Sequence, residues 1–320
     1  MPAANLLIIH QGALGDFILT FPAIVRLQTY YDRIDVLCQG RLGRLAQALR
    51  LVSNCYPLEA AHVASLFSGR TDPKTKALLE PYTQIILFAL SGQLEQSINQ
   101  ITPNPCCRIP PRPPVHERIH VAKFVLENLV NCGLITKADA ALDQIATPGR
   151  MGRPQNPLRI LLHPGAGSIR KRWPVSNFFC VEAGLKADGL KPEFILGPAE
   201  KNLAAELQRP GRCVHVLDDL PVLLDLLISA AGYIGNDSGA SHLAAYLGLP
   251  SVVIFGPADP ERWKPVGRSV EIVRPALQCR PCFEINETDC DDQRCLEGIT
   301  PQKVTEAFYK MYPDSAIQYL

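Results

Sequence analysis

The chain has 320 residues, of which 47% are hydrophobic, and its formal net charge is +1 at pH 7. This length predicts two domains of ordinary size, each with its own core. A nearly neutral chain is not expected to bind nucleic acid or another polyanion. No apolar run reaches the roughly 18 residues that would span a bilayer, and the first residues lack a signal-peptide pattern, so we expect a cytoplasmic protein.

The first half of the chain predicts alternating strands and helices. Residues 6–9 form a continuous apolar run, which is typical of a strand buried on both faces. The predicted elements are strands at 6–9, 34–38 and 84–90, and helices at 16–30, 43–51, near Glu95 and at 116–132. Residues 103–114 contain six prolines, so we expect no regular structure there.

The second half repeats this alternation after a proline- and glycine-rich segment, residues 147–158, which predicts a linker. Strands are predicted at 159–163, 193–196, 231–235 and 251–255, and helices at 177–188, 201–207, 220–229, 241–247 and 301–312. Repeated strand–helix units favour parallel sheets with helices on both faces. We therefore predict an α/β fold with one domain at 1–150 and a second at 151–300.

Ligands of such sheets bind beyond the carboxyl ends of the strands, where this chain places polar turns. In the second half, Asp237, Ser238 and Gly239 lie where a buried strand passes into a helix. The start of a helix carries unpaired N–H groups and a partial positive charge, so it suits an anion such as phosphate. His242, on the first turn of that helix, either faces a ligand or has a structural role.

A second turn of this half follows the strand at 159–163. Gly165 would let the backbone approach an anion, Ser168 adds a hydroxyl, and Lys171 and Arg172 supply positive charge for a diphosphate. The alternative is a solvated basic loop with Trp173 packed in the core. Neither a P-loop nor a dinucleotide-binding glycine pattern is present in the sequence.

Two further turns each permit two interpretations. Asp16 follows Gly12 and Gly15 at the predicted start of the first helix, where it could cap the helix or act as a general base. Gly256 belongs to a proline-rich turn that could line a base or ribose pocket or could simply be stiff.

The chain has 11 cysteines, most of them scattered, and we expect them to be reduced and to serve as small core residues. Cys279, Cys282, Cys290 and Cys295 are the exception, because they fall within one short segment. Their spacing is not that of a standard zinc ribbon, so a metal site, a disulfide and a compact thiol cluster all stay open.

Taken together, these motifs resemble glycosyltransferase family 9, the ADP-heptose:lipopolysaccharide heptosyltransferases. The matching segments, in family order, are 7–23, 164–174, 235–250, 255–265 and the Cys-x2-Cys cluster. One departure is His10, which stands where many relatives carry an arginine or another residue. Five motifs in family order are far more specific than any one of them.

The resemblance implies a GT-B fold, in which two Rossmann-like domains face each other across a cleft. The C-terminal domain would bind the donor, ADP-heptose, through Gly165, Ser168, Lys171, Arg172, Asp237, Ser238, Gly239, His242 and Gly256. Asp16 would be the catalytic base of an inverting transfer that needs no metal and no cofactor. The helix at 301–320 would pack back onto the N-terminal domain.

The implied acceptor is an anionic saccharide of the lipopolysaccharide core, linked to a lipid. Its expected contacts are Gly12, Gly15, Arg41, Arg118 and Lys123. A lipid-anchored acceptor would bring the enzyme transiently to the inner face of the cytoplasmic membrane. Two alternatives stay open: another GT-B enzyme with a different donor, and a non-catalytic homologue that binds a nucleotide sugar.

Overall fold

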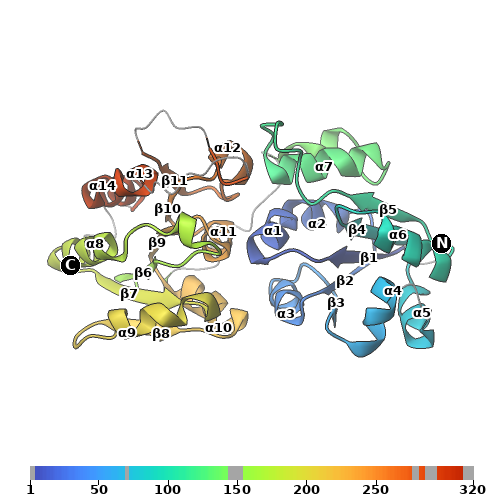
Figure 1. Cartoon of the computed structure of the whole chain (residues 1–320), viewed down its shortest axis with the longest axis horizontal. Helices are drawn as coiled ribbons and strands as arrows, with labels where there is room; N and C mark the ends of the chain where they lie inside the picture. The colour runs from blue at the N-terminus through green and yellow to red at the C-terminus, as the bar shows by residue number, and fades with distance from the viewer. Residues whose placement is uncertain (1–3, 69–71, 143–153, 276–280, 285–293, 313–320) are drawn as a thin grey trace. The chain divides into compact units, whose positions relative to one another are not determined.

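The computed structural model describes residues 4–68, 72–142, 154–275, 281–284 and 294–312. The chain divides into two compact units, Met1–Ala146 and Thr147–Leu320. Each unit contains one sheet in which all strands run parallel, with helices packed on it (Figure 1). The division falls at the start of the segment that predicted a linker.

The N-terminal unit has a five-stranded sheet with the order β3-β2-β1-β4-β5. The strands are β1 (Asn5–His10), β2 (Arg33–Cys38), β3 (Asn54–Pro57), β4 (Gln84–Phe88) and β5 (Cys106–Ile109). β1 is central and pairs with both β2 and β4. The strand order reverses between β1 and β4, and this switch point is where open parallel sheets bind ligands.

Helices and short 3₁₀ turns connect these strands or follow the last of them. They are α1 (Leu14–Leu19), α2 (Phe21–Leu27), α3 (Gly40–Ala48), η1 (Ala61–Ala64), α4 (Ser65–Ser68), α5 (Pro73–Leu79), α6 (Gln93–Ile101), α7 (Val121–Asn131) and η2 (Ala138–Ala140). The single helix predicted at 16–30 is in fact two. Pro22 has no N–H to donate to the Ile18 carbonyl, which interrupts the helical ladder, and the Thr20 hydroxyl donates to the Phe17 carbonyl at 2.6 Å.

The proline-rich segment 103–114 was wrongly predicted to lack regular structure, because β5 lies inside it. Its four residues contain no proline, and the strand is at the sheet edge, where it pairs with β4 alone. Edge strands tolerate flanking prolines, since one side of their ladder is open. Cys107 of β5 forms a disulfide with Cys132, so the expectation of reduced cysteines is wrong for this pair.

The C-terminal unit has a six-stranded sheet with the order β11-β10-β9-β6-β7-β8. The strands are β6 (Arg159–His163), β7 (Lys191–Leu196), β8 (Cys213–Val216), β9 (Gly232–Asn236), β10 (Ser251–Ile254) and β11 (Val270–Val273). Here the order reverses between β6 and β9. The carboxyl ends of these two strands carry the two turns at which the sequence predicts phosphate binding, and we call them the phosphate-type turns.

The helices of this unit are η4 (Ile169–Lys171), α8 (Val175–Ala187), η5 (Pro198–Leu203), α9 (Ala204–Leu207), α10 (Leu220–Ser229), α11 (Gly239–Tyr246), α12 (Pro260–Trp263), α13 (Arg294–Glu297) and α14 (Pro301–Met311). The longest of the described helices, α8, has 13 residues. Across the described part of the chain, no helix combines the length and the apolar character that crossing a membrane requires.

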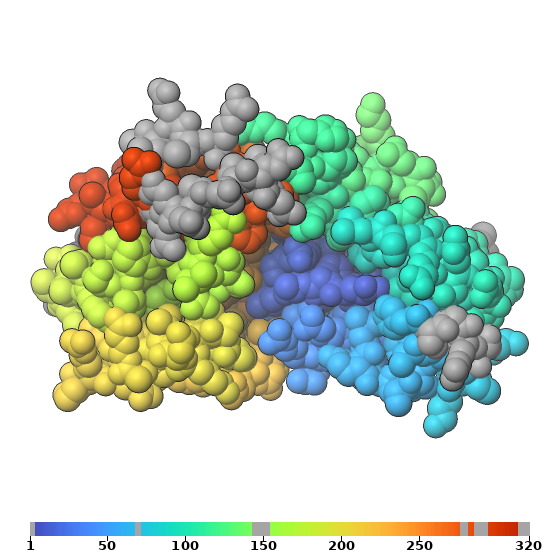
Figure 2. Space-filling view, viewed as in Figure 1, coloured from blue at the N-terminus to red at the C-terminus, as the bar shows by residue number. Residues whose placement is uncertain are grey.

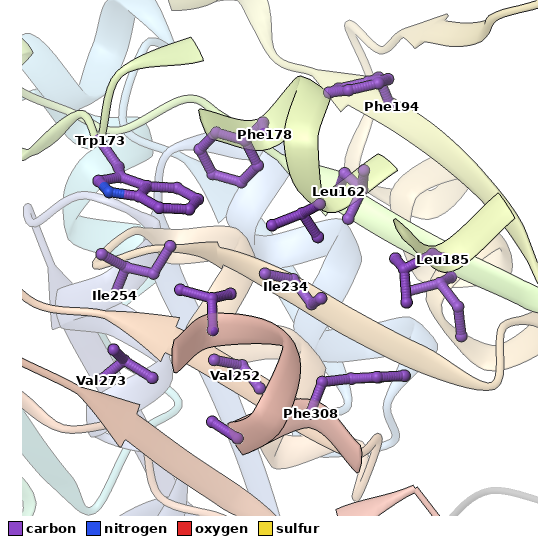
Figure 3. Close-up of a cluster of buried hydrophobic side chains, with 14 of the residues drawn as sticks. Leu162, Trp173, Phe178, Leu185, Phe194, Ile234, Val252, Ile254, Val273 and Phe308 are labelled. Carbon is purple, nitrogen blue, oxygen red and sulfur yellow. The ribbon is translucent and has the colours of Figure 1, made fainter. Parts of the chain in front are cut away.

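The last helix belongs to the core of the C-terminal unit. Phe308 of α14 packs with Trp173, Phe178 and Ile234 in one buried cluster (Figure 3). A Cβ at Gly232 would lie 2.5 Å from the Phe308 ring, so the helix sits directly against β9. The apolar face of α14 is thus buried on the sheet of its own unit, whereas packing of 301–320 on the N-terminal domain stays a prediction. Residues 313–320 lie outside the described residues.

Candidate functional site

The first candidate site is the turn between β1 and α1. Asp16 lies in the first turn of α1, and its Oδ2 accepts a hydrogen bond from the Ala13 N–H at 3.3 Å. The same half-buried side chain lines a pocket of about 410 Å³. Figure 2 shows that this first strand–helix segment, in dark blue, reaches the surface of the N-terminal unit. Asp16 thus has the contacts of a cap and also faces a cavity, as a base would have to.

His10 holds this turn in place. It is 1% exposed, and its Nδ1 accepts the Gly12 N–H at 3.1 Å. Burial lowers the pKa of His10 to about 4, so the ring is neutral at pH 7 and its proton lies on Nε2. A Cβ at Gly12 would lie 2.7 Å from the His10 ring and 2.9 Å from the Asp16 Cβ. Gly12 therefore permits the close approach of His10 and Asp16.

The pocket beside Asp16 has an apolar side and a polar side. Phe67 and Leu90 line it and are 47% and 64% exposed, which is high for large apolar side chains. Arg112 and Gln93 contribute polar groups to the same lining. The pocket therefore suits a ligand with hydroxyl or anionic groups next to an apolar surface.

Of the predicted acceptor residues, only Gly12 lines this pocket. Gly15, Arg41, Arg118 and Lys123 do not, and the Lys123 ammonium instead pairs with Glu127 on the helix surface at 3.8 Å. The cation that does line it, Arg112, was missed because it lies in the proline-rich segment that was set aside as irregular.

In the C-terminal unit, one buried amide joins the two phosphate-type turns. Asn236, at the end of β9, is fully buried. Its Nδ2 donates to the Pro164 carbonyl at 2.8 Å, and its Oδ1 accepts from the Trp173 N–H at 3.1 Å. The loop after β6 is thus fastened at both ends to the strand that precedes α11. Asn236 falls within the family motif at 235–250, but its side chain was assigned no role from the sequence.

A second set of contacts fixes Gly165 and Arg172. A Cβ at Gly165 would lie 2.4 Å from the Glu200 carboxyl carbon, so the backbone packs directly on that side chain. Burial raises the pKa of Glu200. The Arg172 guanidinium donates to the Ala166 and Ala199 carbonyls at 3.2 and 3.3 Å and lies 3.5 Å from Glu200 Oε1. Through these contacts Arg172 stabilises the loop after β6. Glu200 was not identified from the sequence.

Lys171 is the cation placed at the opening of α11. Its Nζ lies 2.7 Å from Asp237 Oδ2 and 4.1 Å from the centre of the Phe283 ring. Lys171 is 18% exposed and Asp237 is 6% exposed, so this ion pair is largely removed from water. His242 Nε2 lies 4.0 Å from the other Asp237 oxygen. Asp237 therefore positions the ammonium between α11 and the loop after β6.

The start of α11 has the geometry of an anion site. Ser238 caps the helix, because its Oγ accepts from the Ser241 N–H at 3.4 Å. The same Oγ lies 3.2 Å from His163 Nδ1, and burial, together with the charge of Arg172, lowers the pKa of His163 to about 4. The N–H groups of Gly239 and Ala240 are not reached by any preceding helical carbonyl. Ser238 shapes the turn, and the helix start offers the donors.

The remaining predicted positions have structural contacts. A Cβ at Gly256 would lie 2.7 Å from the Leu296 side chain, so this glycine allows α13 to pack against the turn. Ser168 caps η4 by accepting from the Arg170 N–H at 3.3 Å. Cys282 N–H donates to the Pro257 carbonyl at 2.9 Å. Cys279 and Cys290 lie outside the described residues, so the four-cysteine prediction stays a prediction.

Comparison with known proteins agrees with these motifs. Residues 136–290 match the family model of glycosyltransferase family 9 (heptosyltransferase). Lipooligosaccharide heptosyltransferase 2 of Campylobacter jejuni serotype O:2 is 30% identical over 168 residues, which are 48% of this chain and 52% of that protein. Lipopolysaccharide heptosyltransferase 1 of Pseudomonas aeruginosa is 29% identical over 172 residues, 47% of each chain. The chain spans about half the length of the curated relatives it matches.

Solved structures resemble the whole chain. The E. coli ADP-heptose lps heptosyltransferase II has a TM-score of 0.73 at 17% identity, covering 98% of this chain and 99% of that one. E. coli heptosyltransferase WaaC with ADP has a TM-score of 0.68 at 16% identity, covering 96% and 99%. TibC from enterotoxigenic E. coli, described as iron-containing, has a TM-score of 0.58 at 16% identity, covering 97% and 76%. The predicted α/β fold of the GT-B class is confirmed, and the match of residues 136–290 to the glycosyltransferase family 9 model agrees with the family that the motifs resemble.

Proposed function

We propose that the protein is an inverting glycosyltransferase that moves heptose from ADP-heptose to a lipid-linked saccharide of the lipopolysaccharide core. The observation that carries this proposal is the placement of Lys171, held by Asp237, beside the start of α11. Both lie within the segment that matches the heptosyltransferase family model. A solved relative is described as binding ADP, which supports the choice of donor nucleotide.

The donor diphosphate would bind at the start of α11. As the bond to the sugar breaks, negative charge develops on the departing ADP. The Lys171 ammonium and the Gly239 and Ala240 N–H groups would stabilise that charge, because they are fixed before the reaction begins. Asn236 would contribute indirectly, since it holds the loop that carries Lys171. His242 and Asp237 would order this loop.

The acceptor would bind in the pocket beside Asp16. An inverting transfer requires a base that removes the proton of the acceptor hydroxyl while its oxygen attacks the anomeric carbon. Asp16 lines that pocket, and the hydrogen bond from the Ala13 N–H and the packing of Gly12 keep it in place. Arg112 would pair with an anionic group of the acceptor, and Phe67 and Leu90 would cover its apolar part.

Two finer parts of the proposal concern metal and membrane. The positive groups at α11 could neutralise the leaving diphosphate without a divalent cation, so we propose that transfer is independent of added metal. An acceptor on a lipid anchor would bring the enzyme transiently to the cytoplasmic face of the inner membrane. Transfer in the presence of a chelator tests the first part, and sedimentation with vesicles that contain the acceptor tests the second.

Nucleotide selectivity and product formation test the central proposal. The melting temperature is measured with ADP, UDP and GDP, and transfer is followed as ADP released from ADP-heptose in the presence of a heptose-deficient lipid-linked core saccharide. We expect stabilisation by ADP alone and release that depends on the acceptor. Stabilisation by UDP instead would point to another donor, and ADP binding without any transfer would point to a non-catalytic homologue.

A further inference from the structure

A group of metal-ligating side chains lies on β7 and β8, outside the donor and acceptor sites. His215 Nε2 is 2.8 Å from Glu193 Oε2 and 3.4 Å from Cys213 Sγ. The three ligand atoms all lie within 4.8 Å of one another. A carboxylate, an imidazole and a thiol therefore converge on one point.

The register of the sheet explains why they converge. Glu193 is directly opposite Cys213, and Ile195 is opposite His215, so the three side chains lie on the same face. Phe194 points to the other face, into the core cluster (Figure 3). β8 is the edge strand of this sheet, and Cys213 is exposed, which leaves the group open to ions from solvent.

The distances suit a small, tetrahedral cation of borderline softness. Zinc binds thiolate, imidazole and carboxylate at about 2.0–2.3 Å, which places neighbouring ligand atoms about 3.3–3.6 Å apart. The sulfur–nitrogen distance already falls in this range, and the nitrogen–oxygen pair needs only a small rotation of the carboxylate. Three protein ligands leave the fourth position for water.

Arg159 prepares the carboxylate for this role. Its Nε donates to Glu193 Oε1 at 2.9 Å, and its Nη1 donates to the Ser229 hydroxyl at 2.8 Å. One carboxylate oxygen is thereby fixed, while Oε2 faces His215 and Cys213. Outer contacts of this kind orient metal ligands and raise metal affinity.

We propose that Glu193, Cys213 and His215 form a zinc site that fastens the edge strand β8 to β7. It is separate from the four-cysteine segment, whose described members Cys282 and Cys295 lie beyond β10 in the sequence. A site here would stabilise the C-terminal unit without taking part in transfer, so its failure would leave the proposed function untouched.

The test uses Co²⁺ as a spectroscopic probe for zinc in the full-length protein, after chelator treatment. The background is Cys282→Ser/Cys295→Ser, which removes two thiols of the other cysteine segment that could also bind the metal. We expect one equivalent of Co²⁺ with a single thiolate charge-transfer band, displaced by Zn²⁺. Adding Cys213→Ser or His215→Ala should abolish the band, and Glu193→Gln should weaken binding by at least about tenfold.

The matched control is Cys180→Ser, because Cys180 is also an exposed, unpaired thiol of the C-terminal unit. It should leave the band and the stoichiometry unchanged. Thermal unfolding with chelator present shows whether each variant still folds, and added Zn²⁺ should raise the melting temperature only where Cys213 and His215 are intact. Absence of the band in the background protein, or equal binding after Cys213→Ser, would overturn the proposal.

Discussion

Each unit of the molecule joins a central strand to a helix through a polar turn, yet the two turns present opposite chemistry. In the N-terminal unit, the turn after β1 presents the carboxylate of Asp16 to a pocket, and His10 beneath it is neutral. In the C-terminal unit, the turn after β9 presents the start of α11 and the Lys171 ammonium. The first turn suits the removal of a proton, and the second suits the binding of an anion.

This difference shows that the backbone path alone does not determine what a turn of this kind can bind or catalyse. Both turns lie at the carboxyl end of a strand next to a topological switch point. In the first, Asp16 itself satisfies the Ala13 N–H at the start of α1. In the second, the neutral Ser238 hydroxyl accepts the Ser241 N–H, and the Gly239 and Ala240 N–H groups have no preceding helical carbonyl to bond. The side chain that caps each helix decides whether a base or an anion site results.

Asp16→Asn should have the largest effect on the N-terminal turn. The amide can still accept the Ala13 hydrogen bond but cannot take a proton, so kcat should fall by about 10²–10⁴-fold while ADP binding is kept. Turnover and ADP affinity are measured on the same preparation. Glu80→Gln, an exposed carboxylate change in the same unit, should alter neither. Unchanged turnover in Asp16→Asn would show that Asp16 is not the catalytic base.

Asn236→Ala should destabilise the C-terminal unit, because Asn236 joins the loop after β6 to the end of β9. The change leaves the Pro164 carbonyl and the Trp173 N–H buried without their partner. We expect a loss of about 3 kcal/mol in the free energy of unfolding of this unit, measured by denaturant titration. Ser251→Ala, at another fully buried polar side chain of this sheet with one 2.6 Å bond to a carbonyl, should cost less. Equal losses would show that Asn236 is an ordinary buried residue.

Lys171→Ala should weaken the anion site directly. Loss of one charged contact to the diphosphate predicts about 10–100-fold weaker ADP binding, measured by calorimetry. Lys201→Ala is the matched control, because Lys201 pairs with Asp218 at 2.9 Å but both are exposed. A similar affinity for ADP in both variants would show that Lys171 does not contact the donor diphosphate.

His10→Phe should give the smallest effect, visible as a change in pH dependence. Burial in the folded protein lowers the pKa of His10 from 6.5 to about 4. As the pH falls, His10 is therefore protonated in the unfolded state before it is protonated in the folded state. Stability from this residue is present above pH 6.5 and is lost as the pH falls towards 4. The variant should therefore lose about 2 kcal/mol less than the parent over that interval, measured by denaturant titration at each pH. Parallel pH profiles would contradict a buried, neutral His10.

The predictions from sequence succeeded where a strand contains a continuous apolar run. β1, β4, β6 and β10 were all found in this way, because central strands of a parallel sheet are buried on both faces. The edge strands β3, β8 and β11 were missed, since partial burial leaves a mixed pattern. β5 was missed because its flanking prolines are compatible with an edge position that the sequence does not reveal.

The site divides in the same way. The sequence predicted Asp16, Lys171 and Asp237 as site residues, since their motifs place charge next to glycine-rich strand ends. It did not identify Arg112 or Glu200, which reach their turns from segments without a motif.

By itself, the sequence determined the alternation of central strands and helices in each half and the family motifs, and it named candidate groups for holding a diphosphate and taking a proton. Only the tertiary structure decided that Asn236 joins two loops, that Arg172 holds backbone carbonyls, and that α14 packs on the C-terminal sheet. The physical reason is that periodicity and motif spacing report local burial and local chemistry. Hydrogen-bond partners and packing faces depend on which distant segments the fold brings together.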